Sequence, residues 1–490
     1  MLIDLLALKR LAYFVPLLVG AFSSISCGQQ HDNKYIHGIW TAEDSLNGVL
    51  YKHVLQLDEI DGEGLAVSAR ATYLGHPVRM QFDTAFVYGD SVRFWSDNTG
   101  IKDIFKGKLD GDVISGEFTR NDQTREMTFR RFDLKAHRPQ TPIRPFPYVE
   151  EEVHFANRDS SVVFSGTFTF PKGGGRYPAV LVATGSGPQD RDGDLYFHDP
   201  YLVIADYLTR HGIAVLRLDD RNVGRTVEAP GAKVDFVDDA MCAIEFLRGH
   251  ANVDCRRIGI VGHSQGGLIA MEVAAAVPDL AAVVSLGSPI SVTGGDYFLN
   301  HYEPFIANMT HQSKKKVTRL MSEIFNMIKE TPSKRRAADL ILDKLKIWLE
   351  YNRDDKEALS AFLFTPDDVA NEMAIREMLE KSFGYYFSRD HYYILSYDPD
   401  AVFPKITCPV LAIYGGHDNR ISFPAEEERL DFLVSRSGIE LEAKCFARMN
   451  HFLQTSNSMN DTEVFESDET VSPEVLELLK HWLIERLNAD

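Results

Sequence analysis

The chain has 490 residues, more than one hydrophobic core normally serves, so a single small module is excluded and two or more domains are expected. Hydrophobic residues make up 44% and charged residues 25%, which argues against a disordered chain or a polytopic membrane protein. The 71 acidic and 52 basic residues give a formal net charge of −19, a field that repels phosphate backbones, so nucleic acid is not an expected partner.

The long apolar run of the chain lies near its N-terminus. A basic pair at 9–10 precedes the apolar stretch 11–22, and small residues follow, which is the layout of a signal peptide over residues 1–27. The stretch is short for a membrane span. Cys27 follows Ser24-Ile25-Ser26 as in a degenerate bacterial lipobox. The sequence therefore predicts export to the periplasm or cell envelope, with either a lipid anchor at Cys27 or an ordinary cleaved signal.

Residues 35–134 contain short stretches in which apolar and polar residues alternate, such as 50–57, separated by turn pairs such as Asp110-Gly111. This pattern predicts antiparallel hairpins, with about seven strands before Phe132, enough for a small barrel or sandwich. No catalytic constellation is visible there. The segment 137–147 carries four prolines, which predicts a stiff extended linker and a domain boundary.

After the linker, near-continuous apolar runs alternate with helical segments. Two strand-like segments come first, at 151–157 and 162–170, and buried strands are predicted at 179–184, 213–218, 257–261, 281–286 and 409–414. Helices are predicted near 200–211, 236–248, 265–276 and 424–435. This alternation predicts a doubly wound, mostly parallel α/β sheet formed by residues 145–290 and 400–490.

A long insertion separates the strands at 281–286 and 409–414. Residues 317–328 carry apolar side chains three and four positions apart, which predicts a helix with one apolar stripe. We expect residues 296–395 to form a helical cap that roofs the substrate pocket. Apolar cap residues such as Trp348 are expected to set the preference among acyl chain lengths. A second independent domain in the insertion is the alternative.

The string Gly262-His-Ser-Gln-Gly266 follows one predicted strand and opens a helix, the context of a nucleophile elbow at Ser264. A serine hydroxyl needs a histidine base and an orienting carboxylate. Asp418 and His451 each follow a predicted strand, so both belong to the carboxyl edge of the sheet. The order Ser264, Asp418, His451 is that of the α/β-hydrolase fold. His263 is a weaker candidate base because strand alternation directs it away from Ser264.

An acyl-transfer site also needs an oxyanion hole of backbone N–H groups. Gln265, directly after the nucleophile, is expected to supply one donor, and Ser186 or Gly187, in the loop after strand 179–184, the other. The acidic cluster at 190, 192 and 194 lacks the remaining positions of a calcium loop, and the cysteines show no metal spacing, so no metal site is expected.

At these motifs the sequence resembles bacterial α/β-hydrolase carboxylesterases close to the serine aminopeptidase branch. The resemblance covers residues 145–490, and some members carry a similar β-rich N-terminal domain. It departs at Asn222 and Thr226, where the family usually has Gly and Ser. The matching strings are 185–193, 219–225, 262–266, Asp418, 450–454 and the helix start at 472–474.

The resemblance implies a cofactor-independent serine hydrolase that acts on acyl bonds, most often those of small carboxylic esters. A peptidase or aminopeptidase is the first alternative, and its substrate would be a peptide. A non-catalytic envelope binding protein is the second, because this scaffold also serves proteins without activity. The natural substrate, the oligomeric state and the role of the β domain do not follow from the sequence.

Overall fold

The computed structural model describes residues 36–488 apart from 47–48, 60–66, 75–77, 82–83, 99–100, 121–122, 332, 363–372, 374, 377–382 and 460–461. The predicted signal peptide over 1–27, with Cys27, lies outside the described residues. Within the described part, no helix combines the length and the apolar content that crossing a membrane requires. The chain forms two compact units: the first ends at Phe132, and the main segment of the second begins at Asp133.

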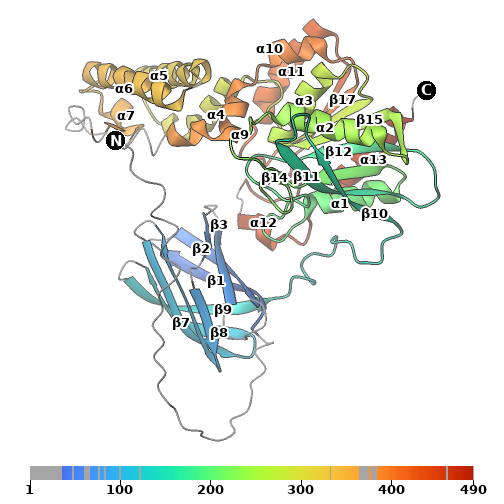
Figure 1. The fold of residues 1–490 in the computed structure, drawn as a ribbon. Coiled ribbons are helices and arrows are strands. Elements are labelled where there is room, and N and C mark those ends of the chain that lie inside the picture. The colour runs from blue at the N-terminus through green and yellow to red at the C-terminus, as the bar shows by residue number, and fades with distance from the viewer. Residues whose placement is uncertain are drawn as a thin grey trace, which may run out of the picture. The chain divides into compact units, whose positions relative to one another are not determined.

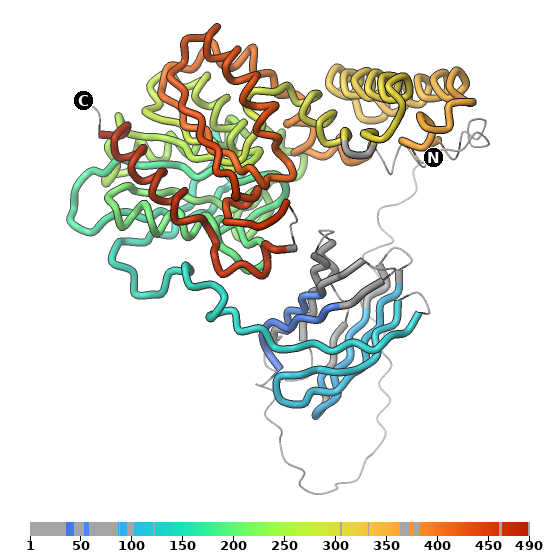
Figure 2. The backbone as a smooth tube through the Cα atoms, turned by 180° about the vertical axis from the view of Figure 1, so that it is seen from behind, coloured from blue at the N-terminus to red at the C-terminus, as the bar shows by residue number. Residues whose placement is uncertain are grey.

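The first unit, drawn in blue to cyan in Figure 2, is a β-sheet. Its strand order is β4-β3-β2-β1-β9-β8-β7-β6-β5. Its nine described strands exceed the predicted seven because β4 and β5 have only 4 and 5 residues, too few for an alternating pattern to be recognised. Its apolar core includes Phe94 and Phe105, whose rings stack at 4.7 Å. The strands are β1 (Gly38–Leu46), β2 (Val49–Glu59), β3 (Val67–Leu74), β4 (Val78–Gln81), β5 (Thr84–Tyr88), β6 (Ser91–Asn98), β7 (Ile101–Asp110), β8 (Val113–Arg120) and β9 (Gln123–Phe132).

The second unit contains a sheet in the order β10-β11-β13-β12-β15-β16-β17-β18, with the short β14 (Val227–Glu228) paired to β11. The strands from β13 to β18 run parallel, and β11 pairs antiparallel with β10 and β13. The strands are β10 (Tyr148–Ala156), β11 (Val162–Pro171), β12 (Tyr177–Ala183), β13 (Ala214–Leu218), β15 (Val253–His263), β16 (Ala282–Leu286), β17 (Val410–Gly415) and β18 (Leu441–Phe446).

Helices cover both faces of this sheet (Figure 1). Side chains alternate along β12, so Val180 and Val182 belong to the apolar cluster that includes α1 and α13, whereas Leu181 belongs to the cluster of the opposite face, which includes α2, α3 and α11. These two apolar layers hold the parallel strands and fix where their carboxyl ends lie. The helices are α1 (Pro200–Arg210), α2 (Phe236–Gly249), α3 (Gln265–Ala276), α11 (Phe423–Ser437) and α13 (Pro473–Leu487), with the shorter α10 (Pro399–Val402), η4 (Phe403–Lys405) and α12 (Thr462–Glu466).

The insertion between β16 and β17 is helical over its described residues. The residues of the predicted stripe in α5, Val317 to Ile328, are buried. Figure 1 shows α5, α6 and α7 beyond α4 and α9, away from the sheet. Trp348 on α6 packs edge-on against Phe362, with ring centroids 5.6 Å apart, inside the cap itself. The elements are α4 (Gly294–Ile306), α5 (His311–Glu330), α6 (Lys334–Tyr351), α7 (Lys356–Ser360), η3 (Gly384–Phe387) and α9 (Arg389–Ser396).

The segment that follows Phe132 is bound to the second unit instead of forming a free spacer. Arg138 is buried, and its guanidinium donates to the backbone carbonyls of Tyr196 and Phe197 and to those of Phe465 and Ser467, at 2.9 to 3.1 Å. The prolines of this segment predicted its extended character. Its place is held by Arg138 together with Gln140, whose side chain bonds the backbone of Thr470 and Val471.

Candidate active site

Ser264 occupies the turn between β15 and α3 with φ 54° and ψ −119°, a left-handed backbone conformation that non-glycine residues rarely adopt. Glycines allow the turn because the backbone approaches itself closely. A Cβ on Gly262 would lie 2.0 Å from the carbonyl oxygen of Gly266, and one on Gly266 would lie 2.2 Å from that of Ala183. This sharp turn places the serine hydroxyl at the carboxyl edge of the sheet.

The structure brings Ser264, His451 and Asp418 together. The Oγ of Ser264 lies 3.2 Å from Nε2 of His451, although 187 residues separate them. Nδ1 of His451 lies 2.9 Å from Oδ2 of Asp418, and both side chains are 1% exposed. Because the carboxylate accepts from Nδ1–H, Nε2 is left free to accept a proton from the serine hydroxyl.

The carboxylate of Asp418 stays ionised despite its burial. Oδ1 accepts the backbone N–H groups of Arg420 at 2.8 Å and Ile421 at 2.9 Å. Burial, the largest effect, raises the pKa of Asp418, but the charge and hydrogen bond of His451 and these two N–H groups together hold it below its usual value. The acid is therefore fixed in place and charged at neutral pH.

A compact turn carries His451. Oδ1 of Asn450 accepts the N–H groups of Phe452 at 2.9 Å and Gln454 at 3.0 Å, and its Nδ2 donates to Oε1 of Gln454 at 3.1 Å. Gln454 is fully buried. The string 450–454, which carried the family resemblance, thus closes the loop that presents His451.

The three residues expected at the oxyanion hole lie on two segments next to Ser264. Gln265 is the first residue of α3, where backbone N–H groups have no partner within the helix. Ser186 and Gly187 lie in the loop 184–194 after β12, which we call the oxyanion loop. A Cβ on Gly185 would lie 3.4 Å from the Cβ of Ser264, so this loop runs beside Ser264.

The residues at the end of β13 hold the oxyanion loop. The carboxylate of Asp220 accepts the hydroxyl of Thr184 at 2.7 Å and the backbone N–H of Gln189 at 2.8 Å. Burial is the main cause that raises the pKa of Asp220, to about 7. One side chain therefore bridges the two ends of the turn that contains Ser186 and Gly187.

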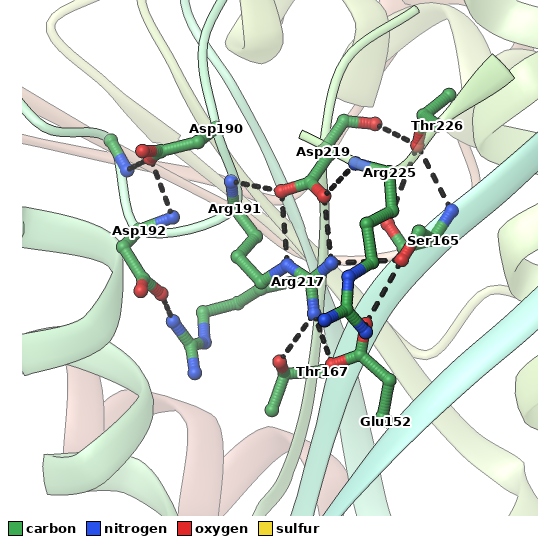
Figure 3. Close-up of polar contacts among 11 residues, drawn as sticks. Glu152, Ser165, Thr167, Asp190, Arg191, Asp192, Arg217, Asp219, Arg225 and Thr226 are labelled. Carbon is green, nitrogen blue, oxygen red and sulfur yellow. Dashed lines mark hydrogen bonds and ion pairs between the residues drawn. The ribbon is translucent and has the colours of Figure 1, made fainter. Parts of the chain in front are cut away.

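Arg191 anchors the same loop further along (Figure 3). Its guanidinium donates to both carboxylate oxygens of Asp219, at 2.9 and 2.7 Å, and to Glu152 and Thr167 on the neighbouring strands. The backbone N–H of Arg191 adds a third bond to Asp219 at 3.0 Å. Sequence reasoning missed this pair, although both residues lie in strings that carried the resemblance.

The carboxylates of the acidic cluster are used within the structure of the oxyanion loop and its neighbours. Oδ1 of Asp190 accepts the N–H group of Asp192 at 3.1 Å (Figure 3). It also accepts those of Gly193 at 2.8 Å and Asp194 at 3.3 Å. Asp192 pairs with the buried Arg217, and Asp194 accepts the N–H of Phe197. Among the described residues, no three His, Cys, Asp or Glu side chains are arranged to hold a metal ion.

The two departures from the family pattern have structural roles. Asn222 has a φ of 61°, a conformation for which glycine is the usual residue, and its Nδ2 donates to Oε2 of Glu228 at 2.7 Å. The hydroxyl of Thr226 accepts the N–H of Ser165 at 2.9 Å and donates to the carbonyl of Asp219 at 2.9 Å. Both lie in the loop that supports the Asp219 anchor.

Helix α4 of the cap approaches the site. Nδ1 of His301 donates to the carbonyl of Tyr297 at 3.0 Å. Burial lowers the pKa of His301, and the charges of His451, Arg420 and Asp418 also act on it. The charges of triad residues therefore act on two residues of α4, because Asp418 also acts on Tyr297, whereas Trp348 belongs to the cap's own core.

The profile of the alpha/beta hydrolase family matches residues 179–458, more than half of the chain. The chain belongs to the α/β-hydrolase family. This confirms the resemblance and the predicted fold class, because the matched segment contains Ser264, Asp418 and His451. The three residues lie at the ends of β15, β17 and β18, where this fold places its nucleophile, acid and base.

Among characterised relatives, this chain is similar to Esterase EstD of Thermotoga maritima. The two are 25% identical over 341 residues, which cover 69% of each chain. Among solved structures, an esterase of Pyrococcus furiosus covers 73% of this chain and 95% of its own at 15% identity, with a TM-score of 0.41. The hydrolase GrgF of Penicillium sp. sh18 covers 70% and 100% at 16% identity, with a TM-score of 0.39.

Proposed function

We propose that this protein is a serine hydrolase that cleaves carboxylic esters of small molecules through an acyl-enzyme. The observation that carries the proposal is the continuous contact from Ser264 Oγ through His451 to the ionised Asp418. The similarity to Esterase EstD supports an ester as the bond that is cut. The same contact argues against an idle binding protein, because no binding role requires a buried histidine aimed at a strained serine.

In the first half-reaction, Ser264 Oγ attacks the ester carbonyl carbon while Nε2 of His451 takes the hydroxyl proton. Collapse of the tetrahedral intermediate breaks the bond to the alkoxy oxygen, and His451 gives its proton to the departing alcohol. Water then attacks the acyl-enzyme with the same assistance and releases the acid and free Ser264. Asp418 remains ionised throughout and stabilises the imidazolium that forms twice per cycle.

Backbone donors stabilise the oxyanion of both intermediates. We assign one to the N–H of Gln265, at the positive end of α3, and the other to the N–H of Ser186. Ser186 is preferred over Gly187 because it directly follows Gly185, the residue that lies beside Ser264. Gly187 lines a cavity of about 230 Å³ together with Thr184 and Asp220, and Ser264 is not among the residues that line it.

Labelling with a fluorophosphonate tests the mechanism. Wild-type protein should be phosphonylated at Ser264, and Ser264→Ala should not react. The control variant is Ser437→Ala, because Ser437 lies on α11 and donates only to the carbonyl of Leu433. A panel of nitrophenyl esters set against aminoacyl anilides tests the bond that is cut. Faster turnover of the anilides would replace the esterase proposal with a peptidase.

A further inference from the structure

A buried tyrosine joins three segments of the active site. Tyr201 on α1 is 3% exposed and lies between the oxyanion loop and the strand that ends at the nucleophile. We propose that Tyr201 is a positioning residue whose hydroxyl holds the oxyanion loop in register with the loop that carries His451. This inference rests on the proposed function, since it assigns a role within that reaction.

The hydroxyl of Tyr201 has three neighbours. It accepts the backbone N–H of Gly185 at 3.1 Å, lies 3.1 Å from Oε1 of Gln189 and lies 3.3 Å from Nδ1 of His263. The last two atoms are acceptors for its single proton. The hydroxyl therefore meets the oxyanion loop at two points, and it meets β15 at the residue before Ser264.

His263 carries the connection to the base. Its Nε2 lies 2.9 Å from the backbone carbonyl of His451, which can only accept, so Nε2 carries the proton and Nδ1 is an acceptor. The ring remains neutral because burial, the main cause, lowers the pKa of His263 to about 3. When the Tyr201 hydroxyl donates to Nδ1 of His263 and not to Oε1 of Gln189, a chain of hydrogen bonds runs from the His451 carbonyl through His263 and Tyr201 to Gly185.

Two anchors bracket the proposed donor at Ser186. Tyr201 fixes the N–H of Gly185, one residue before it. Nε2 of Gln189 donates to the carbonyl of Ser186 at 3.2 Å, which fixes the next peptide plane. Because peptide units are planar, holding the flanking units restricts the direction of the Ser186 N–H between them.

The ring of Tyr201 is fixed as firmly as its hydroxyl. A Cβ on Gly193, whose φ is 75°, would lie 2.5 Å from ring carbons of Tyr201, so the far end of the oxyanion loop packs directly on the ring. The backbone N–H of Tyr201 also donates to the carbonyl of Asp192 at 3.1 Å. The loop therefore closes around this side chain.

Tyr201→Phe removes only the hydroxyl and keeps the ring that Gly193 contacts. The buried N–H of Gly185 then loses its acceptor, and the loop can move relative to Ser264. We expect kcat to fall by about 10- to 100-fold, with KM for a nitrophenyl ester changed less than about threefold, because an oxyanion donor acts mainly in the transition state. The affinity for an alkyl boronate, which mimics the intermediate, should fall in parallel with kcat.

Tyr148→Phe is the matched control. Tyr148 is also buried, and its hydroxyl donates to Asp206 on the same helix α1 at 2.9 Å, so its loss also removes a tyrosine hydroxyl bond to the α1 region. Both variants should show similar losses in melting temperature. Only Tyr201→Phe should slow phosphonylation of Ser264, and only it should speed amide hydrogen exchange over residues 184–187.

The outcomes separate the inference from the proposed function. If wild type reacts and Tyr201→Phe reacts within about twofold of its rate, the positioning role is wrong and the esterase proposal stands. If wild type does not react, the serine hydrolase proposal fails and the inference with it. Should Tyr201→Phe not fold, Gln189→Ala removes the second anchor from a half-buried position, and an unchanged kcat in that variant would overturn the inference.

Discussion

The ring of His263 donates a hydrogen bond of 2.9 Å to the backbone carbonyl of His451, across 188 residues of sequence. The residue before the nucleophile thus holds the backbone of the base, while the nucleophile's own hydroxyl lies 3.2 Å from that base's Nε2. Residues 263–264 therefore contact His451 twice, once through each side chain. The distance from Ser264 Oγ to the His451 ring thus depends on two contacts and not on one side-chain rotamer.

The acid of the triad provides the first prediction. Asp418→Asn keeps the size of the side chain but reverses the hydrogen bond at Nδ1 of His451, which favours the wrong tautomer. We expect kcat to fall about 10³- to 10⁴-fold, somewhat less than the loss of about 10⁴-fold or more in Ser264→Ala. Steady-state kinetics on a nitrophenyl ester measures both. A near wild-type rate in Asp418→Asn would mean that another carboxylate orients His451.

The second prediction concerns the anchor of the oxyanion loop. A lysine at position 191 keeps the charge but cannot donate to both oxygens of Asp219, so the loop should loosen. We expect Arg191→Lys to lower kcat about tenfold and the unfolding free energy by about 1–2 kcal/mol.

Arg158→Lys is the control for this prediction. Arg158 also pairs with two carboxylates, those of Asp238 and Glu245, but it is 52% exposed and touches no part of the oxyanion loop. Kinetics and urea unfolding of the two variants should differ clearly. Equal kcat values would show that the Arg191 pair contributes nothing to the reaction.

The sequence was sufficient for the parts of the site that belong to single elements. Buried parallel strands are continuous apolar runs, and a reactive residue follows the strand that carries it, so Ser264, Asp418 and His451 could be found by position alone. The string at 450–454 could also be recognised from the sequence. Its structural role, a turn that the Asn450 side chain closes, is seen only in the folded protein.

Contacts between elements that no motif marks could not be predicted. Tyr201 and His263 lie 62 residues apart, and nothing in an apolar helix marks one tyrosine as a partner of a strand end. The cap shows the same limit. Its amphipathic pattern predicted the buried stripe of α5, but a pattern does not state which helix faces the site, and Trp348 packs away from it.

The third prediction replaces Trp348 with His301 as the cap determinant of selectivity. His301→Ala removes an α4 side chain on which the charge of His451 acts, so the relative kcat/KM for short and long acyl esters should change about fivefold or more. Trp348→Ala removes packing on Phe362 and should lower stability without reordering the substrates. An ester series of increasing acyl length measures both. A changed ranking only in Trp348→Ala would reverse this assignment.

The last prediction concerns the pH dependence of stability and centres on Glu426. This carboxyl is 2% exposed and accepts the N–H and hydroxyl of Ser291 at 2.9 and 2.8 Å, yet burial raises its pKa to about 7. Between the ordinary glutamate pKa and about 7, the folded protein holds a proton that the unfolded chain has released. This group therefore favours folding at the acidic end of that window, and its contribution is lost as pH rises to 7.

Glu426→Gln is neutral at every pH and tests this directly. At pH 5 the folded wild-type side chain is also protonated, so the two proteins should differ mainly by the altered hydrogen bonds to Ser291 and Tyr414. At pH 8 wild type must keep a buried charge, so the unfolding free energy of Glu426→Gln relative to wild type should increase from pH 5 to pH 8. Urea unfolding across this range measures the difference, and a constant difference would show that Glu426 is ionised throughout.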